Sequence, residues 1–323
     1  MKDSVDIISV EDRERWIAEH ARGGLPSQSL NYAWALSASG VAPKLAVVQS
    51  GGARMLLPFF EREFRGTVDV ASILCLSGAS IEPGSRSPVD TWREYAMQRG
   101  WVAGYLQLSP LIEGLVAPEH DLATVNEVLL LEIGEKTSPT HFAETIRQKI
   151  RKAEISASLV EDRTQVSAAL QRLYPETLER MQTHSAYGFS NATLERWTTD
   201  PSSIAIGAAL GGVIEAVSLF SVALPHAEYQ LNASSDRGRD LSAWLLWKAI
   251  ERLRALGVRS LNLGGGAKPG DGIYEFKRRF GTTARPLRAI RQIYDCAKYD
   301  ELCAATGASA GERWFPAYRA ARR

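Results

Sequence analysis

One lysine stands out in this sequence because it lies on an otherwise apolar face of a predicted helix. A strand pattern leads into the glycine run 264–266, and a short helix follows Asp271, which can cap it. Three apolar side chains share one face of that helix: Ile273, Phe276 and Phe280. Lys277 falls within this face, so its charge must either extend to the edge of the apolar surface or point into a cleft. Taken alone, this position favours a surface lysine or an ion pair with Glu275 or Asp271, and the alternative is a catalytic cation in a cleft.

A second candidate site precedes the predicted helix 241–256. Arg237, Gly238 and Arg239 combine two cations with a glycine that lets a ligand approach the backbone. The start of a helix also offers free N–H groups and a positive dipole end, which suit a phosphate. The pattern predicts a phosphate cradle, and the alternative is an ordinary capped loop with solvated arginines.

The stretch from Lys277 to Arg291 is strongly basic and holds no acidic residue. Its cations are Lys277, Arg278, Arg279, Arg285, Arg288 and Arg291. In a chain whose formal net charge is only +1, this indicates a local positive patch. Such a patch suits a polyanionic ligand such as a nucleotide, CoA or the end of an RNA, although a solvated basic face is an equal alternative.

A predicted strand over residues 226–233 offers candidates for a general base. Polar side chains alternate along it, so a regular strand would place four of them on one face: His226, Glu228, Gln230 and Asn232. His226 or Glu228 could then remove a proton in a substrate cleft, whereas the alternative is a polar face that contacts water.

Other classes of function fit poorly. The five histidines are dispersed without a metal-ligand spacing, and the sequence has no nucleophile elbow and no dinucleotide-binding glycine motif. A protein that coats duplex DNA would be far more basic. Three scattered cysteines form no disulfide framework, and Cys296 and Cys303 are expected to be buried or partly buried thiols. Without a long apolar run or a signal-like start, the expected location is the cytoplasm.

The elements that position these residues are predicted twice along the chain. Strand, Gly-Gly turn, return strand, helix, helix-stopping glycine and strand recur in that order. In the first copy the strand is expected at residues 44–49, the turn at 51–52, the return strand at 55–60, the helix at 89–98, the glycine at 100 and the last strand at 101–108. In the second copy the strand is expected at 203–210, the turn at 211–212, the return strand at 213–221, the helix at 241–256, the glycine at 257 and the last strand at 258–263. This repeated order predicts a tandem duplication in which each copy is a sheet with helices packed on it.

The expected boundary gives domains 1–139 and 140–323, the second carrying the candidate site. A basic helix is expected over residues 140–153 at this boundary. A further helical region is expected over 162–182, with a kink or break at Pro175.

Taken together, these features resemble the FemABX-like branch of the GNAT acyltransferases. The most specific part is the glycine-rich loop followed by Phe276-Lys277-Arg278-Arg279-Phe280. Further likeness lies in four other stretches: Ser29-Leu30-Asn31-Tyr32-Ala33, Tyr105-Leu106-Gln107-Leu108-Ser109-Pro110, the basic helix that ends at Ala153, and Tyr229-Gln230-Leu231-Asn232-Ala233-Ser234. The resemblance implies an α/β (α+β) chain of two tandem GNAT-like domains, each a mixed, mostly antiparallel sheet flanked by helices.

The resemblance also implies an activity, the transfer of an aminoacyl group from aminoacyl-tRNA to an amine of a cell-wall precursor or peptide-like metabolite. In that family the motif lysine, Lys277 here, lies in the acyl-donor region and stabilises charge in the transition state. On this assignment Phe276, Phe280 and Arg278 lie near the donor, and Arg237, Gly238 and Arg239 hold its phosphates. The residues expected to line the acceptor pocket are Tyr229, Gln107 and Tyr105.

The donor and the base stay open. The chain has no clean pyrophosphate signature of CoA-dependent relatives, which favours aminoacyl-tRNA over acyl-CoA, whereas its neutrality favours the reverse. No tightly bound cofactor or metal is expected, and membrane contact is expected to be peripheral at most. The rival interpretations are an acyl-CoA dependent N-acetyltransferase and a non-catalytic binding module.

Overall fold

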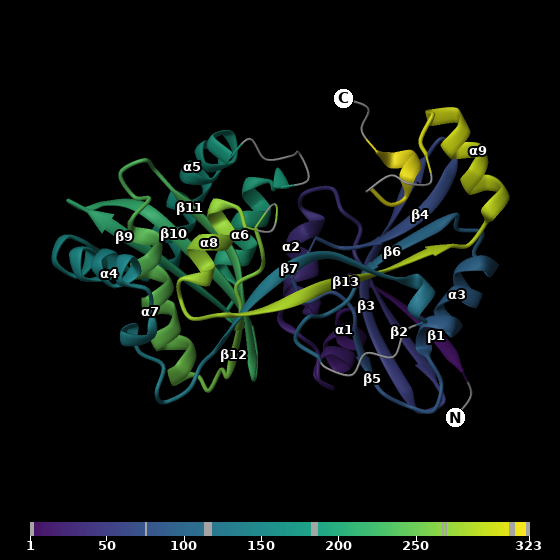
Figure 1. Ribbon diagram of the computed structural model, residues 1–323, viewed down its shortest axis with the longest axis horizontal. Coiled ribbons are helices and arrows are strands. Elements are labelled where there is room, and N and C mark those ends of the chain that lie inside the picture. The colour runs from purple at the N-terminus through teal and green to yellow at the C-terminus, as the bar shows by residue number, and fades with distance from the viewer. Residues whose placement is uncertain are drawn as a thin grey trace. The chain divides into compact units, whose positions relative to one another are not determined.

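The computed structural model describes residues 3–74, 76–112, 118–181, 187–266, 268, 270–309 and 314–320. The chain divides into two compact units, both of which are discontinuous in the sequence. Unit 1 comprises Met1–Gly24, Ala42–Val125 and Pro286–Arg323, and unit 2 comprises Leu25–Val41 and Asn126–Arg285. Each unit is a mostly antiparallel sheet flanked by helices, which confirms the predicted fold class (Figure 1). The division into duplicated copies at residues 139 and 140 stays a prediction.

In unit 1 the sheet carries its helices against a core rich in tryptophan. The strand order is β1 (Ser4–Ser9), β2 (Lys44–Ser50), β3 (Ala53–Phe64), β4 (Thr67–Ser72), β6 (Ala103–Gln107) and β13 (Thr283–Ile293), with β5 (Ser80–Glu82) paired to β3. The helices are α1 (Arg13–His20), α3 (Pro88–Gln98) and α9 (Cys296–Thr306), with short 3-10 turns at Glu119–Asp121 and Ala317–Arg319. Phe59, Trp92 and Trp101 pack edge to face or tilted in this core, with ring centroids 5.3 to 5.8 Å apart.

Unit 2 is likewise a mostly antiparallel sheet flanked by helices, and several of its helices are longer than those of unit 1. Its strand order is β7 (Leu122–Glu132), β12 (Ser260–Asn262), β11 (His226–Ser234), β10 (Val213–Ala223), β9 (Ser203–Leu210) and β8 (Ser158–Val160). Its helices are α2 (Leu30–Ser37), α4 (Glu144–Ser156), α5 (Arg163–Met181), α6 (Asn191–Thr199), α7 (Leu241–Ala255) and α8 (Gly272–Arg278), with 3-10 turns η1 (Pro26–Gln28) and η3 (Pro139–His141). The apolar side of α7 packs with α4 against the sheet, as buried Trp244, Leu245 and Ile250 show.

Glycine explains where the predicted hairpins and helix ends fall. Both residues of each Gly-Gly turn, 51–52 and 211–212, have positive φ, which is the backbone that a two-residue hairpin turn requires. Gly100 and Gly257 follow α3 and α7 with φ of 70° and 87°, and so end these helices in the left-handed conformation. The two hairpins and the two helix ends confirm the repeated order predicted from the sequence.

Three local expectations differ from the structure. Helix α5 runs unbroken through Pro175, because buried Leu173 and Thr177 fix this part of the helix, and the Thr177 hydroxyl donates to the Leu173 carbonyl at 2.9 Å. Strand β12, Ser260–Asn262, is shorter than the expected strand over residues 258–263. Cys296 is exposed at the start of α9, whereas Cys303 is partly buried as expected. Cys75 lies outside the described residues.

Candidate active site

In unit 2 two parallel neighbouring strands separate at their carboxyl ends. β11 and β12 pair over only three positions, the last of which joins Glu228 and Asn262. Beyond Asn262 the chain follows β7 instead: the Leu263 N–H donates to the Leu129 carbonyl at 2.9 Å, and the Leu129 N–H donates to the Gly264 carbonyl at 3.2 Å. β11 meanwhile continues along β10 to Ser234. The two strands therefore diverge, and the end of a parallel pair in an α/β sheet is a common place for a ligand.

A β-bulge divides the polar side chains of β11 between two faces. The register of β10 and β11 shifts between Leu219 and Phe220, which pair with Leu231 and Tyr229, so that Gln230 is the extra residue. His226 and Glu228 consequently lie on one face of the sheet, and Asn232 lies on the other with Tyr229. The expectation that His226, Glu228, Gln230 and Asn232 share one face is wrong, because it assumed an uninterrupted strand.

Glu228 is a buried carboxylate on the face opposite Tyr229. Only 1% of the residue is exposed, and its Oε2 accepts a hydrogen bond from the hydroxyl of Ser27. Ser27 is itself fully buried within η1. A buried carboxylate needs such donors, because its charge has lost water. Ser27 is a site residue that the sequence did not indicate.

His226 begins the same strand and is half-buried. Its desolvation lowers the pKa of the imidazole, which favours the neutral form. Within the described part of the chain, its buried Nδ1 has no hydrogen-bond partner.

The other side of the diverging strands is formed by the glycine-rich loop. The Asn262 side chain, fully buried, accepts the Gly264 N–H at 2.8 Å, and Gly264 has a φ of 67°. A Cβ on Gly265 would lie 2.2 Å from the Glu127 carbonyl oxygen, so the loop presses against β7 at that point. The Asn126 side chain donates to the Gly266 carbonyl at 3.1 Å. Only glycine permits this close approach at residue 265.

Lys277 reaches this loop from α8. Its Nζ donates to the Gly265 carbonyl oxygen at 2.7 Å. The residue as a whole keeps part of its surface exposed, but protein atoms surround its ammonium end, and this desolvation lowers the pKa to about 8, although nearby Asp271 opposes the shift. Lys277 is therefore held inward rather than extended into water.

The rest of α8 explains why the lysine points this way. Asp271 caps the helix by accepting the N–H groups of Ile273 at 3.0 Å and Tyr274 at 2.8 Å. The Tyr274 hydroxyl bonds to the Glu127 carboxylate, a contact that raises the pKa of Tyr274. Phe280 is buried against Phe142, with ring centroids 5.0 Å apart, and against Phe276 at 5.4 Å. Arg278 is exposed and pairs with Glu275 at 2.8 Å, so Glu275 has an ion-pair partner other than Lys277.

The buried carboxylate and the buried ammonium are joined by one short segment. Glu228 is paired with Asn262, and Lys277 bonds to Gly265, three residues further on. Three extended residues span at most about 11 Å, which limits the distance between the backbones of Asn262 and Gly265. The carboxylate and the ammonium are thus both connected to the segment 262–265.

The predicted phosphate cradle is already occupied by the protein's own ion pairs. Arg237 pairs with Glu215 at 3.3 Å, and Arg239 pairs with Asp236 at 2.6 Å. A Cβ on Gly238 would lie 1.9 Å from the Glu215 carbonyl oxygen, so protein backbone fills the space beside this glycine. The adjoining hollow of about 400 Å³ is lined by three acids and two arginines: Glu176, Glu179, Arg180, Asp236 and Arg239. Phosphate binding at these residues stays a prediction.

Tyr105 and Gln107, the remaining predicted acceptor residues, belong to β6 of unit 1, where burial raises the pKa of Tyr105. In that unit β4 and β6 are also a parallel pair, joined at Val70–Gly104 and Ala71–Tyr105. Their expected role at an acceptor pocket stays a prediction.

The gap beyond this parallel pair in unit 1 is filled by the chain itself. The Ala79 N–H donates to the Gln107 carbonyl at 2.7 Å, and the Ser109 N–H donates to the Ala79 carbonyl at 2.8 Å. Ser77 and Ala79 are fully buried, and a Cβ on Gly78 would lie 2.6 Å from the Gln107 carbonyl oxygen. In unit 1, residues 77–79 therefore fill the place beyond the parallel pair. In unit 2 the strands diverge at the corresponding place.

The residues of the predicted basic stretch differ in their exposure. Within unit 2, Arg278 is ion-paired with Glu275, and Arg279 and Arg285 are exposed. Within unit 1, Arg288 is exposed and Arg291 is half-buried, with its guanidinium 5.9 Å from the centre of the Phe315 ring. A polyanion site here stays a prediction.

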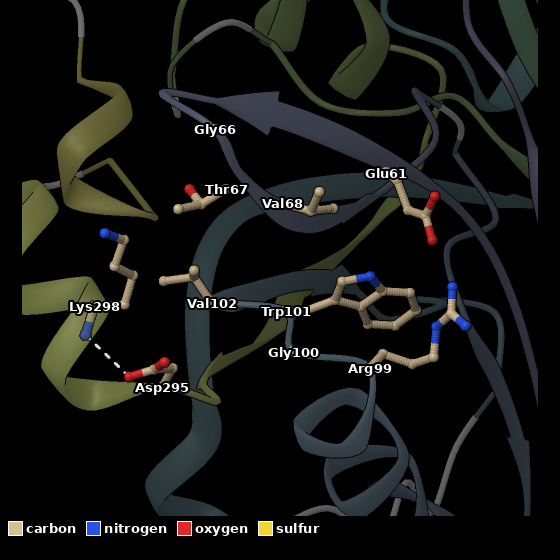
Figure 2. A pocket seen from close by; sticks show the side chains of 10 residues that line it. All are labelled: Glu61, Gly66, Thr67, Val68, Arg99, Gly100, Trp101, Val102, Asp295 and Lys298. Atoms are coloured by element: carbon tan, nitrogen blue, oxygen red, sulfur yellow. Dashed lines mark hydrogen bonds between the residues drawn. The ribbon is translucent and has the colours of Figure 1, made fainter.

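Figure 2 shows a separate hollow of unit 1, about 320 Å³ in volume, that contains none of the predicted site residues. It is lined by Glu61, Gly66, Thr67, Val68, Arg99, Gly100, Trp101, Val102, Asp295 and Lys298. Its charged groups are largely paired: Glu61 with Lys44 at 2.8 Å and Lys298 with Glu301 at 2.8 Å. In the described ranges no group of three metal-ligating side chains comes together, and none of the helices there is long and apolar enough to cross a membrane.

Several solved structures share this arrangement of strands and helices. FemX superposes with a TM-score of 0.62 and 12% identity over 92% of this chain and 99% of its own. L-PGS from Bacillus licheniformis has a TM-score of 0.57 and 12% identity, over 86% of this chain and 91% of its own. The C-terminal DUF2156 domain of an Agrobacterium fabrum protein has a TM-score of 0.53 and 18% identity, over 84% of this chain and 90% of its own. No protein-family profile and no curated protein matches the sequence. The chain thus shares its fold with FemX, which is the fold that the sequence resemblance predicted.

Proposed function

We propose that the protein is an N-acyltransferase that moves an aminoacyl group from aminoacyl-tRNA to an amine of a cell-wall precursor or peptide-like metabolite. The observation that carries this proposal is the inward-held ammonium of Lys277 at the loop beside the diverging strands. A cation kept in a desolvated place is suited to a reaction in which negative charge develops. The shared fold with FemX supports the same class of chemistry.

In this reaction Glu228 acts as the base and Lys277 stabilises the developing negative charge. The neutral amine attacks the ester carbonyl, so an N–C bond forms and the ester C–O bond breaks. Glu228 takes the proton that the amine nitrogen loses and passes it to the ribose oxygen of the tRNA, which leaves as a hydroxyl. Lys277 stabilises the negative charge that develops on the carbonyl or leaving oxygen, an effect worth about 3 kcal/mol for one well-placed donor. Holding the amine against the carbonyl supplies much of the remaining acceleration.

Two features support aminoacyl-tRNA as the donor rather than acyl-CoA. The sequence lacks the pyrophosphate loop of CoA-dependent relatives. The arginines that would replace it, Arg237 and Arg239, are engaged with Glu215 and Asp236. A CoA pyrophosphate would have to displace these ion pairs before it could bind.

The test is donor-dependent transfer by the purified protein. Labelled aminoacyl-tRNAs and, separately, acetyl-CoA are incubated with a panel of amine acceptors, and amide products are identified by mass spectrometry. Transfer from aminoacyl-tRNA is expected, with a kcat lower by about 10²–10³ in Lys277→Ala. Lys298→Ala, which removes a lysine of α9 in unit 1 that pairs with Glu301, is the matched control and should retain activity. Transfer from acetyl-CoA alone would replace the proposed donor, and full activity of Lys277→Ala would remove the site.

A further inference from the structure

One segment of the chain packs in the unit to which its sequence neighbours do not belong. Leu25–Val41 is part of unit 2, although the residues on either side of it belong to unit 1. The Asn31 side chain donates to the Asp200 carboxylate at 2.9 Å, and the Thr193 hydroxyl donates to the Ala35 carbonyl at 2.8 Å. These bonds fix the segment against α6.

Aromatic contacts strengthen the same docking. The rings of Tyr32 and Trp197 lie 5.1 Å apart, and the Trp197 indole N–H donates to the Tyr32 carbonyl at 3.3 Å. Trp197 is 2% exposed and Thr193 is fully buried, so α6 uses this segment as part of its core. The segment is therefore a structural part of unit 2, not a loose linker.

The first turn of this segment brings Ser27 to Glu228. Pro26 begins η1, and the Gln28 side chain accepts the Leu25 N–H at 2.9 Å, which closes the turn on itself. Ser27 and Gln28 are both fully buried. Ser27 is thereby held with its hydroxyl donating to the Glu228 carboxylate, from a position 201 residues away in the sequence.

We propose that Ser27 is a positioning residue that holds the Glu228 carboxylate for proton removal, so that the N-terminal segment completes the reactive site of unit 2. This inference rests on the proposed function, in which Glu228 accepts the proton of the attacking amine. A hydrogen bond to one carboxylate oxygen restricts the side-chain rotamers and keeps the group oriented without any transfer to the serine itself. The hydroxyl proton stays on Ser27 throughout.

The experiment is a double-mutant cycle on steady-state transfer. Ser27→Ala should lower kcat about tenfold, the loss of one charge-assisted hydrogen bond, and leave the KM of the donor within about twofold. Ser27→Thr keeps the hydroxyl and should stay within about threefold of wild type, while Glu228→Gln should lose about 10²–10³ in kcat. The double variant should be no slower than Glu228→Gln alone, because Ser27 acts only through that carboxylate.

Ser29→Ala is the matched control within the same segment. Ser29 caps α2 by accepting the Tyr32 N–H at 3.2 Å, so its loss should lower stability but leave kcat unchanged. Circular dichroism melts for every variant separate a smaller folded fraction from a slower enzyme.

Three outcomes would overturn the proposal. Wild-type kcat in Ser27→Ala would remove the positioning role while leaving the proposed function intact. A further tenfold loss in the double variant would show a general structural role instead. Absence of transfer by the wild-type protein would remove the proposed function, and this inference with it.

Discussion

The ammonium of Lys277 lies 2.7 Å from the carbonyl oxygen of Gly265, the glycine at which the loop after β12 comes closest to β7. This contact joins the two parts of the stretch that the sequence analysis considered together, the glycine run and the lysine on an apolar helix face. Gly265 allows the loop to approach β7, and α8 directs Lys277 toward that loop. The position of the lysine therefore depends on the position of the glycine-rich loop.

Transfer should depend on the protonated form of Lys277. Burial lowers the pKa of this ammonium to about 8, so kcat/KM is expected to fall as pH rises through about 8 rather than near the ordinary lysine value of 10.5. A pH–rate profile from neutral pH to about pH 10 measures this. Lys277→Arg, which stays charged throughout, should lose this decline, and a profile for the wild type that is flat across pH 8 contradicts the assignment.

Replacing the same lysine with an apolar residue should stabilise the fold. A shift from 10.5 to about 8 corresponds to a cost of about 3 kcal/mol for holding the charge at neutral pH, partly offset by the hydrogen bond to Gly265. Lys277→Met should therefore raise the free energy of unfolding by about 2 kcal/mol while it lowers kcat by about 10²–10³. Urea unfolding at pH 7 provides the measurement.

The pH dependence of this gain follows from the sign of the shift. Between pH of about 8 and 10.5 the unfolded chain binds a proton that the folded chain has released, so wild-type stability rises with pH through this window. The advantage of Lys277→Met should shrink correspondingly, and an advantage that stays constant up to pH 10.5 would show that the ammonium is not desolvated.

Adding one methyl group at Gly265 should disturb both the fold and the site. Its Cβ would lie 2.2 Å from the Glu127 carbonyl oxygen, which is backbone and cannot swing away. We expect Gly265→Ala to cost about 2–3 kcal/mol and to lower kcat, since the loop must shift from β7. Gly134→Ala is the control, because no atom lies within 4 Å of a Cβ there. Equal melting temperatures for the two variants would refute this.

The chain should bind a single acyl donor. The strands of unit 2 diverge after Glu228, whereas in unit 1 residues 77–79 bond to Gln107 and Ser109 at the corresponding place. Titration with a non-hydrolysable aminoacyl-tRNA analogue, followed by calorimetry, should give one site per chain. Two equivalent sites would require the buried segment around Gly78 to leave its place.

The sequence was a good guide wherever the signal was local. Positive-φ glycines set both hairpin turns and two helix ends, and the apolar face of α8 drew attention to Lys277, whose role stays a prediction; each of these patterns spans only a few residues. Period-two alternation failed along β11, since the bulge at Gln230 depends on the pairing with β10 and leaves no mark in the strand's own sequence.

Long-range contacts were beyond such reasoning. Nothing local distinguishes Ser27 from other serines, and its partner Glu228 lies 201 residues away. Likewise, the ion pairs of Arg237 and Arg239 depend on where Glu215 and Asp236 come to lie in the fold. One weak signal was present: Asn262 is a polar residue inside an apolar strand pattern, and a buried amide there needs a partner, which proved to be Gly264.

The placement of Leu25–Val41 has a consequence for biosynthesis. This segment leaves the ribosome before α6, its docking surface, which is completed only at Thr199. At 5–20 residues per second the interval is on the order of 10–30 s, during which Tyr32 and Trp34 lack the contacts that α6 later provides. Leu25–Val41 therefore cannot dock until well over a hundred further residues have been made, and a fragment that ends at residue 140 would lack the helix against which it packs.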